Sequence, residues 1–257
     1  FGGLSASFIG EQSGVARSVN GGLTFEFADT SAEGSWPHDL HFIDAQTGWL
    51  ASGEFPDSDT GQGQYYGVIQ RTDDGGKTWA KQFDVDGYYF TSIHFTDAWN
   101  GWAVAQGDNV SRIYHSTDGG ANWTQQSVPA TGVLHLAYVE MFDPLEGWVI
   151  GWEPLTINPG VVLYHTVDGG ANWAHDPFGP PYGPIRLDMV DSTKGWTVGA
   201  NNLQVGAIMV YDSGGPLPPP VVTGVLPIGG PPAGGQDVTI QGANFTSTSD
   251  TTVAFGG

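Results

Sequence analysis

Four polar residues occupy equivalent places in four short apolar segments, and together they offer a ligand set for a metal ion. The segments align without gaps as Leu-His-Phe at 40–42, Ile-His-Phe at 93–95, Val-Glu-Met at 139–141 and Leu-Asp-Met at 187–189. Their central residues are His41, His94, Glu140 and Asp188. Two imidazoles and two carboxylates suit a divalent ion, and Zn²⁺ accepts that set. The alternative is that these side chains line a hydrated channel or form hydrogen bonds between neighbouring repeats.

A second group of oxygen donors lies in the stretch FPDSDTGQGQ at 55–64. Asp57 and Asp59 precede Gly61, a spacing that suits a hard cation such as Ca²⁺. The third acid and the distal glutamate of a full calcium loop are missing, so an exposed acidic turn is the alternative. The sequence predicts no cofactor other than such a divalent cation.

Paired carboxylates would allow a third chemistry, because hydrolysis of a glycosidic bond needs two acids across a cleft. The acids in irregular segments are Asp57, Asp59, Asp86 and Glu153, and their spacing selects no pair. Thiol chemistry is excluded more firmly, since the chain has no cysteine. The many Gly-Gly pairs are turn residues, and no glycine-rich phosphate-binding pattern is visible.

The charge of the chain restricts its partners. It has 27 acidic and 7 basic residues, which give a net charge of −20. Nucleic acids and anionic membranes both require clustered Lys and Arg, so neither is expected as a partner. No apolar run approaches the roughly 18 residues of a membrane-spanning helix, so the chain is not expected to be embedded in a membrane.

Three near-identical stretches must position these side chains: RTDDGGKTWA at 71–80, HSTDGGANWT at 115–124 and HTVDGGANWA at 165–174. In each, an aspartate before a Gly-Gly pair can accept N–H bonds from a tight turn, while glycine supplies a positive φ. A tryptophan five residues later begins the next strand and is positioned to pack. The predicted structural residues are Asp74, Trp79, Asp118, Trp123, Asp168 and Trp173. SVNGGLTFEF at 18–27 is a decayed copy, and YDSGG at 211–215 is read as a terminal remnant.

A second motif alternates with the first. The segments FIDAQTGW, FTDAWNGW, MFDPLEGW and MVDSTKGW have their glycines at positions 48, 101, 147 and 195, which gives steps of 53, 46 and 48 residues. Periods of about 40–50 residues are typical of four-stranded propeller blades. The first motif resembles the Asp-box of BNR-repeat β-propellers, and the alternation resembles the repeats of photosystem II assembly factors. The resemblance implies an all-β propeller of five visible repeats, in a ring of five to seven blades.

Asp-box propellers include sialidases, which bind a carboxylate substrate with three arginines. The chain has four arginines, Arg17, Arg71, Arg112 and Arg186. Arg17 and Arg71 occupy the same place in successive boxes, where His115 and His165 stand in later copies. Repeat position therefore explains these two residues better than a substrate-binding triad does, and a sialidase is not expected.

The composition changes after the repeats. GGPLPPP at 214–220 is predicted to be a stiff, extended linker. The segment 221–257 resembles the opening half of an IPT/TIG immunoglobulin-like domain, with Pro227, the pair Gly234-Gly235 and the alternating run at 238–240. The predicted organisation is a propeller over 1–213, a linker over 214–220 and a partial immunoglobulin-like β-sandwich over 221–257.

Blade geometry predicts which face binds. The two repeated turns fall on one face of the propeller, and the irregular connections fall on the opposite face, where recognition usually occurs. The candidate binding residues in those connections are Trp36, Tyr65, Tyr66, Tyr88, Tyr89, Trp152, Phe178 and Tyr182.

These observations favour a non-enzymatic binding or structural-assembly protein, secreted or at the cell surface, that contacts protein or glycan. Such a module is expected to form part of a larger assembly. The alternative is a glycoside hydrolase of the Asp-box propeller type acting on a polysaccharide.

Overall fold

The structure of the chain is a computed structural model, and it describes residues 14–30, 36–54, 64–108, 110–128, 135–152, 161–176, 183–191, 193–200, 206–212, 221–226, 237–243 and 252–254. Within these ranges the regular elements are β-strands, with no helix among them. The strands form antiparallel sheets, as the sequence predicted.

Three sheets have four strands each and repeat one up-and-down meander. The first contains β3 (Trp36–Phe42), β4 (Gly48–Glu54), β5 (Tyr66–Thr72) and β6 (Ala80–Asp86). The second contains β7 (Tyr89–Phe95), β8 (Gly101–Gln106), β9 (Ser111–Ser116) and β10 (Thr124–Gln126). The third contains β11 (His135–Met141), β12 (Gly147–Trp152), β13 (Val161–Thr166) and β14 (Ala174–Asp176). Each sheet therefore has the strand order of one propeller blade.

Shorter sheets flank these three. β1 (Gly14–Arg17) pairs with β2 (Glu26–Asp29) before them, and β15 (Gly183–Asp191), β16 (Lys194–Ala200) and β17 (Gly206–Asp212) form a three-stranded sheet after them. A last sheet contains β18 (Val221–Leu226), β19 (Asp237–Ala243) and β20 (Thr252–Ala254), in the region predicted to be immunoglobulin-like. The domain limits themselves stay predictions.

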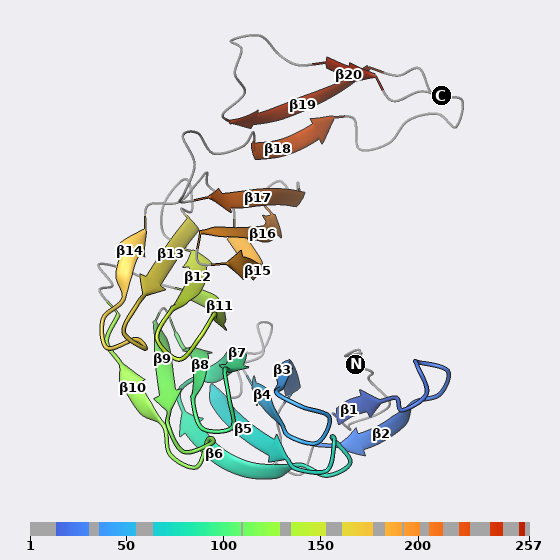
Figure 1. Cartoon of the computed structure of the whole chain (residues 1–257), viewed down its shortest axis with the longest axis vertical. Helices are drawn as coiled ribbons and strands as arrows, with labels where there is room; N and C mark the ends of the chain where they lie inside the picture. The colour runs from blue at the N-terminus through green and yellow to red at the C-terminus, as the bar shows by residue number, and fades with distance from the viewer. Residues whose placement is uncertain are drawn as a thin grey trace.

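The five sheets from β1 to β17 follow one another around an arc (Figure 1). The first strands of the last four of these sheets, β3, β7, β11 and β15, lie on the inner side and contact one another in that order. This radial arrangement confirms the predicted β-propeller fold. The described residues form five repeats along an open arc, so the number of blades in a ring stays a prediction.

Buried hydrogen bonds join the inner strands of neighbouring sheets. Ser92 Oγ donates to Asp39 Oδ2 at 2.8 Å and accepts the backbone N–H of Val139 at 3.2 Å. The backbone N–H of Ile93 also donates to Asp39 Oδ2, at 3.1 Å. A register shift precedes each of these positions, between Pro37 and Asp39 in β3 and between Phe90 and Ser92 in β7. Such a bulge redirects the strand locally, so that side chains reach the next sheet.

The core lies between the sheets and is centred on the tryptophans of the Gly-Trp motif. Trp49, Trp102 and Trp148 are fully buried. Trp49 stacks on Phe95 of the next sheet with ring centroids 3.5 Å apart. Trp49 Nε1 donates to the carbonyl of Gly119 at 2.9 Å, and Trp102 Nε1 donates to the carbonyl of Gly169 at 3.1 Å. The indoles of Trp49 and Trp102 therefore bind the Asp-box turn of the following sheet.

The Asp-box turns have the self-capped geometry that the sequence predicted. Asp118 Oδ1 accepts the Ser116 hydroxyl at 2.9 Å and the N–H of Asn122 at 2.8 Å, and Ser116 Oγ accepts the N–H of Gly120 at 2.9 Å. The boxes around Asp74 and Asp168 repeat these bonds. Gly119 and Gly120 have φ values of 75° and 92°. The decayed copy keeps the turn, because Asn20 Oδ1 replaces the carboxylate as acceptor for the N–H of Thr24 at 3.0 Å.

The tryptophans that end the boxes pack against the core at different depths. Trp173 is buried, whereas Trp79 and Trp123 are half-buried. Trp123 meets Phe95 edge-on with ring centroids 5.8 Å apart, and Trp79 meets Phe42 edge-on at 6.0 Å. Trp173 belongs to the apolar cluster around Trp102 and Val149, so all three rings pack against neighbouring side chains.

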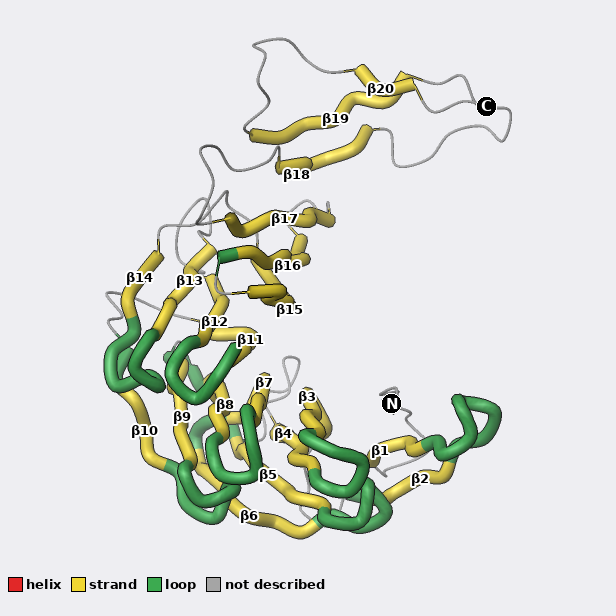
Figure 2. Tube along the Cα trace, in the orientation of Figure 1, coloured by secondary structure: helices red, strands yellow, loops and turns green. Residues whose placement is uncertain are grey.

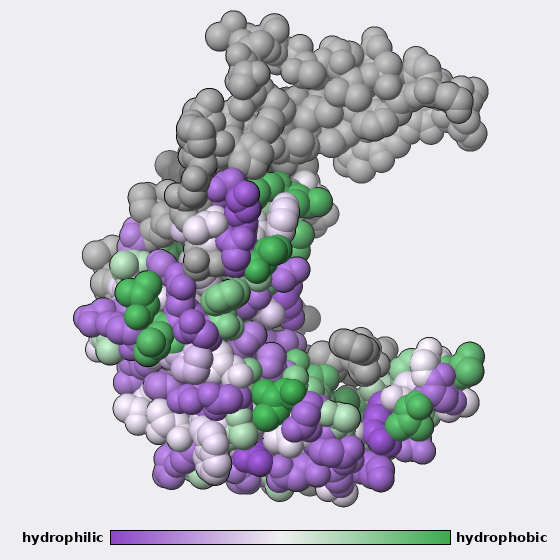
Figure 3. Space-filling view, viewed as in Figure 1, coloured by the Kyte–Doolittle hydropathy of each residue, from purple (hydrophilic) through white to green (hydrophobic). Residues whose placement is uncertain are grey.

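The turns between first and second strands are capped in the same way. Asp44, Asp97, Asp143 and Asp191 each accept two backbone N–H groups from the residues two and three positions later. Figure 2 shows both sets of turns on one face of the arc, which we call the turn face. Figure 3 shows this face as mainly hydrophilic with small apolar spots. The opposite ends of the strands form what we call the loop face.

Candidate binding surface

The structure places the described members of the predicted binding set at the loop face. Trp36 and Tyr89 are the first residues of inner strands β3 and β7, Tyr66 begins β5, and Trp152 ends β12. Trp36 is exposed, and the other five are half-buried: Tyr65, Tyr66, Tyr88, Tyr89 and Trp152. Phe178 and Tyr182 lie outside the described residues.

Several of these side chains form a continuous line across three sheets, which we call the aromatic ridge. It consists of His38, Tyr65, Tyr89, Gln106, His135 and Trp152. Tyr89 stacks with Tyr65 at 5.9 Å between ring centroids and lies 5.3 Å from the ring of His38. The hydroxyl of Tyr89 donates to Gln106 Oε1 at 3.0 Å.

Gln106 continues the line by contacting His135, whose ring stacks on Trp152 at 5.5 Å. The ridge thus runs from the sheet of β3 to the sheet of β11 without a break. Stacked, hydrogen-bonded aromatic side chains have few free rotamers, so a partner meets a surface that is already ordered.

Sequence reasoning missed His38, Gln106 and His135. The repeat register contains a signal for His135, because it begins β11 as Trp36 begins β3 and Tyr89 begins β7. Gln106 pairs with Tyr89 across β7 and β8, just as Trp152 pairs with His135 across β11 and β12. His135 and Gln106 therefore occupy repeat positions equivalent to those of residues that the sequence analysis did predict.

The ridge is a neutral surface at neutral pH. Burial lowers the pKa of His38, with a smaller contribution from the positive charge of Arg186. Burial also lowers the pKa of His135. The pKa of Tyr89 is raised by burial and by the neighbouring Tyr65. Such a surface recognises a partner by stacking and hydrogen bonding rather than by charge.

Arg112 is a cation beside the ridge, in addition to Arg186, whose charge acts on His38. The guanidinium carbon of Arg112 is 3.9 Å from the ring centroid of Tyr88, and its Nη1 donates to the hydroxyl of Tyr114 at 3.2 Å. The four arginines of the chain belong to four different strands, β1, β5, β9 and β15. This dispersion agrees with repeat position as the origin of Arg17 and Arg71.

The candidate metal ligands of the inner strands lie in two pairs. The rings of His41 and His94 are 4.3 Å apart. Burial, with the nearby His41, lowers the pKa of His94 to about 3, so both rings are neutral. Glu140 Oε1 accepts the backbone N–H of Met189 at 3.1 Å, and Asp188 is exposed.

Burial raises the pKa of Glu140 to about 7, with a smaller contribution from Asp188. Within the described ranges no three ligating side chains lie close enough to hold one ion. The predicted metal site therefore stays a prediction, because the structure does not bring its four side chains together around one point. These side chains are His41, His94, Glu140 and Asp188. The calcium candidates Asp57 and Asp59 lie outside the described residues.

The acids considered for hydrolysis are only partly described. Asp86 ends β6 at the loop face and is exposed. Asp57, Asp59 and Glu153 lie outside the described residues, so the structure assigns no carboxylate pair across a cleft.

Comparison with known protein families confirms the repeats that the sequence analysis named. Residues 82–193 match the family model described as photosynthesis system II assembly factor YCF48, and residues 70–81 match the BNR/Asp-box repeat. Residues 220–257 match the IPT/TIG domain. No curated protein matches the chain at a significant level.

Solved structures agree on the fold. A structure described as YCF48 bound to D1 peptide aligns with a TM-score of 0.51 and 21% identity, over 80% of this chain and 61% of that chain. The Niastella koreensis GH74 enzyme aligns with a TM-score of 0.53 and 14% identity, over 78% of this chain and 33% of that chain. This chain thus spans less than two thirds of either structure.

The described residues contain no helix with the length and apolarity needed to cross a membrane. Taken together, the geometry and the family matches show Asp-box β-propeller repeats, similar over residues 82–193 to the photosystem II assembly factor YCF48, followed by a region that matches an IPT/TIG domain.

Proposed function

We propose that this chain is a non-catalytic binding and assembly protein that contacts a protein partner through the aromatic ridge. The observation that carries the proposal is the continuous line of ordered aromatic side chains from His38 to Trp152. Half-buried tyrosine and tryptophan dominate the energetics of protein interfaces, because they present large contact areas with few rotatable bonds.

The electrostatics of the ridge support a partner recognised by shape. Its histidines are neutral at neutral pH because burial lowers their pKa. The structural neighbour described as YCF48 bound to D1 peptide shows that a propeller of this fold holds a peptide. A polypeptide partner is therefore preferred to a charged polymer, in agreement with the net charge of −20.

A glycan is the other class of partner that stacked aromatic rings accept. The half-buried tyrosine, tryptophan and histidine rings offer apolar platforms beside hydrogen-bonding groups such as Gln106. A secreted or surface location also forms part of the proposal. Fractionation of cells that produce the tagged chain, with detection in medium and envelope, tests the location.

The test of the ridge is a pair of arrays, one of extended peptides and one of polysaccharides, probed with the chain and with Tyr89→Ala and Trp152→Ala. Trp99→Ala is the matched control, because Trp99 is an exposed aromatic in a turn of the opposite face. We expect peptide binding that falls at least tenfold in both ridge variants and is unchanged in the control. Binding that survives both ridge variants would refute the proposal.

The same polysaccharide panel tests the hydrolase alternative, which the fold of the GH74 neighbour keeps open. Release of reducing ends at turnover rates, abolished by Asp86→Asn or by replacement of Glu153, would replace the binding function with catalysis. Binding without release agrees with the proposal.

A further inference from the structure

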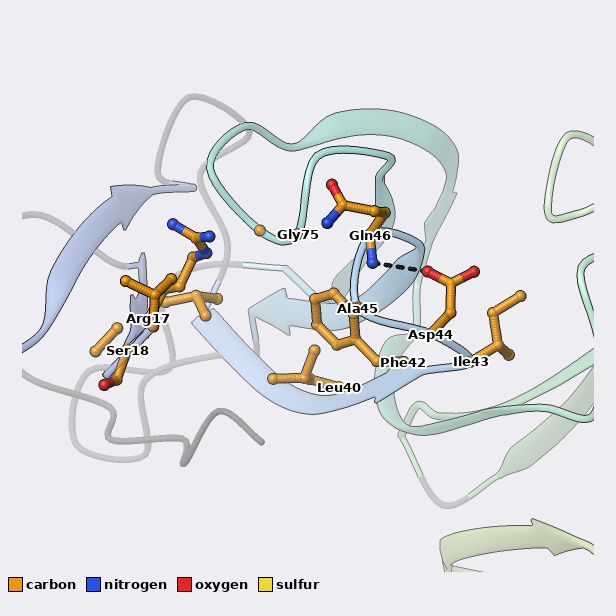
Figure 4. Close-up of a pocket in the computed structure, with 13 residues that line it drawn as sticks. Arg17, Ser18, Leu40, Phe42, Ile43, Asp44, Ala45, Gln46 and Gly75 are labelled. Atoms are coloured by element: carbon orange, nitrogen blue, oxygen red, sulfur yellow. Dashed lines mark hydrogen bonds between the residues drawn. The ribbon is translucent and has the colours of Figure 1, made fainter. Parts of the chain in front are cut away.

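A pocket of about 760 Å³ lies between β1 and the sheet of β3, away from the aromatic ridge. Its lining includes Arg17 of β1, Leu40 and Phe42 of β3, and Gly75 and Gly76 of the Asp-box turn. Figure 4 shows Arg17 facing Phe42 and Gly75 across it. The volume is in the range of pockets that bind ligands, about 300–1,000 Å³.

The next junction along the arc, between the sheet of β3 and the sheet of β7, has an equivalent surface, and a tryptophan is bound to it. There, the ring of Trp49 stacks on Phe95 at 3.5 Å and its Nε1 donates to the carbonyl of Gly119. The guanidinium carbon of Arg71 lies 5.2 Å from the same ring. One indole is thus held between an aromatic ring, a glycine carbonyl and a cation.

Every one of those contacts has an equivalent in the pocket. Arg17 stands where Arg71 stands, and Phe42, Gly75 and Gly76 stand where Phe95, Gly119 and Gly120 stand. A Cβ added to Gly76 would meet Phe42 Cζ at 3.6 Å, and one added to Gly120 would meet Phe95 Cζ at 3.6 Å. Phe42 is 36% exposed, whereas Phe95, covered by Trp49, is 1% exposed.

The strand pairing at the two junctions differs in the same way. Trp49 is brought to its place by β4, which pairs with β5 so that Trp49 lies opposite Arg71. β1 is the counterpart of β5 and, among the described strands, pairs only with β2. A strand added to the inner edge of β1 would place one residue opposite Arg17, directed as Trp49 is directed.

We propose that this pocket, which we call the indole pocket, binds an extended peptide that carries a glycine followed by tryptophan. The peptide adds to the edge of β1 by backbone hydrogen bonds, and its indole lies on Phe42 beneath Arg17 with the N–H directed at the Gly75 carbonyl. Strand addition supplies affinity, and the side-chain pocket supplies specificity. This site is separate from the aromatic ridge and does not rest on the proposed function.

The probe is a fluorescently labelled peptide with the sequence of residues 46–53, QTGWLASG, titrated with the full chain and followed by anisotropy. We expect saturable binding that falls at least tenfold when alanine replaces the tryptophan. A peptide with 1-methyltryptophan, which lacks the indole N–H, should bind about two- to tenfold more weakly. That loss reports the hydrogen bond to the carbonyl.

Variants of the chain locate the site. Phe42→Leu keeps an apolar side chain and should weaken binding about two- to tenfold, and Arg17→Ala about two- to fivefold. Phe142→Leu, at an exposed phenylalanine of another sheet, is the matched control and should leave binding unchanged.

Absence of binding at millimolar peptide, or equal binding by the chain, Phe42→Leu and Arg17→Ala, would overturn the proposal. A full chain that does not bind, beside a variant lacking residues 1–12 that does, would assign the pocket to the chain's own N-terminal segment. That outcome also overturns a site open to a partner.

Discussion

The central junctions of the arc and its ends are built from the same motif, with different results. Trp49 and Trp102 are fully buried, and each donates its indole N–H to the next Asp-box turn. Trp196 holds the equivalent position in β16 and is 43% exposed. At the other end, the indole pocket has the receiving residues without a described tryptophan. The Gly-Trp motif therefore contributes stability only where a following sheet covers it.

The apolar residues around Trp196 show the same difference in burial between the end of the arc and its centre. Val198 and Ile208 are exposed, although the residues at the same register in the preceding sheet, Ile150 and Leu163, are buried. β15–β17 therefore cover their predecessor and are themselves left partly uncovered within the described part of the chain. Repeat proteins show this pattern because each unit buries its apolar face only against its neighbours.

The largest expected effect compares a central tryptophan with the terminal one. Trp102→Ala should lower the free energy of unfolding by about 3–5 kcal/mol, because it leaves a large cavity between two sheets. Trp196→Ala should cost about 1 kcal/mol, since that ring is already partly in water. Urea unfolding followed by far-ultraviolet circular dichroism measures both. Equal losses would show that Trp196 is covered in solution.

The second comparison sets a central Asp-box against the decayed copy. Thr72 is buried, donates to Asp74 Oδ1 at 2.8 Å and accepts the N–H of Gly76 at 2.9 Å. Thr72→Val keeps the shape and removes both bonds, so it should cost about 1–3 kcal/mol. Ser18→Ala removes the same bonds from an exposed turn, where water replaces them, and should cost less than about 1 kcal/mol. Thermal unfolding of the two variants against the parent chain checks the order.

The sequence predicted those turns because their signal is local. An aspartate, two glycines and a hydroxyl within five residues determine one another's hydrogen bonds, and the period of the Gly-Trp motif determines the order of the sheets. The aromatic ridge depends on residues far apart in the chain, such as Gln106 and His135. Their contact follows from the strand register and the curvature of the arc, which local spacing does not encode. Tyr89 and Trp152 were predicted as separate loop aromatics, and their connection emerged only from the structure.

The inner strands offer a comparison that depends on pH. Ser92 and Asp39 join two central sheets, whereas Glu140 joins the sheet of β11 to that of β15 through the N–H of Met189. Burial raises the pKa of Glu140 from 4.5 to about 7. The folded state therefore binds more protons than the unfolded state between these values, and this residue's contribution to stability falls as pH rises from about 4.5 to about 7.

Glu140→Gln removes that dependence. The stability of the variant relative to the parent chain should rise across this window, by an amount on the order of 1–2 kcal/mol, and stay constant above it. Chemical denaturation at a series of pH values gives the difference directly. His94, whose pKa is lowered to about 3, contributes the opposite slope in both proteins and cancels in the difference. A difference that does not change with pH would show that Glu140 is ionised in the folded chain throughout.

The smallest expected effect separates two tryptophans that are equally buried. Trp102 Nε1 has the Gly169 carbonyl as its acceptor, whereas Trp148 Nε1 is buried without a partner in the described part of the chain. The residue at the corresponding register is Gly214, which lies outside the described residues. Replacement by phenylalanine removes the N–H from either site and leaves most of the ring volume. Trp102→Phe should therefore cost about 1 kcal/mol more than Trp148→Phe, because only the first loses a buried hydrogen bond, although Gln126 Nε2 still donates to the Gly169 carbonyl at 2.7 Å. Equal costs in urea unfolding would indicate that the Gly214 carbonyl accepts the Trp148 N–H, and that the last Asp-box remnant completes the junction as its intact counterparts do.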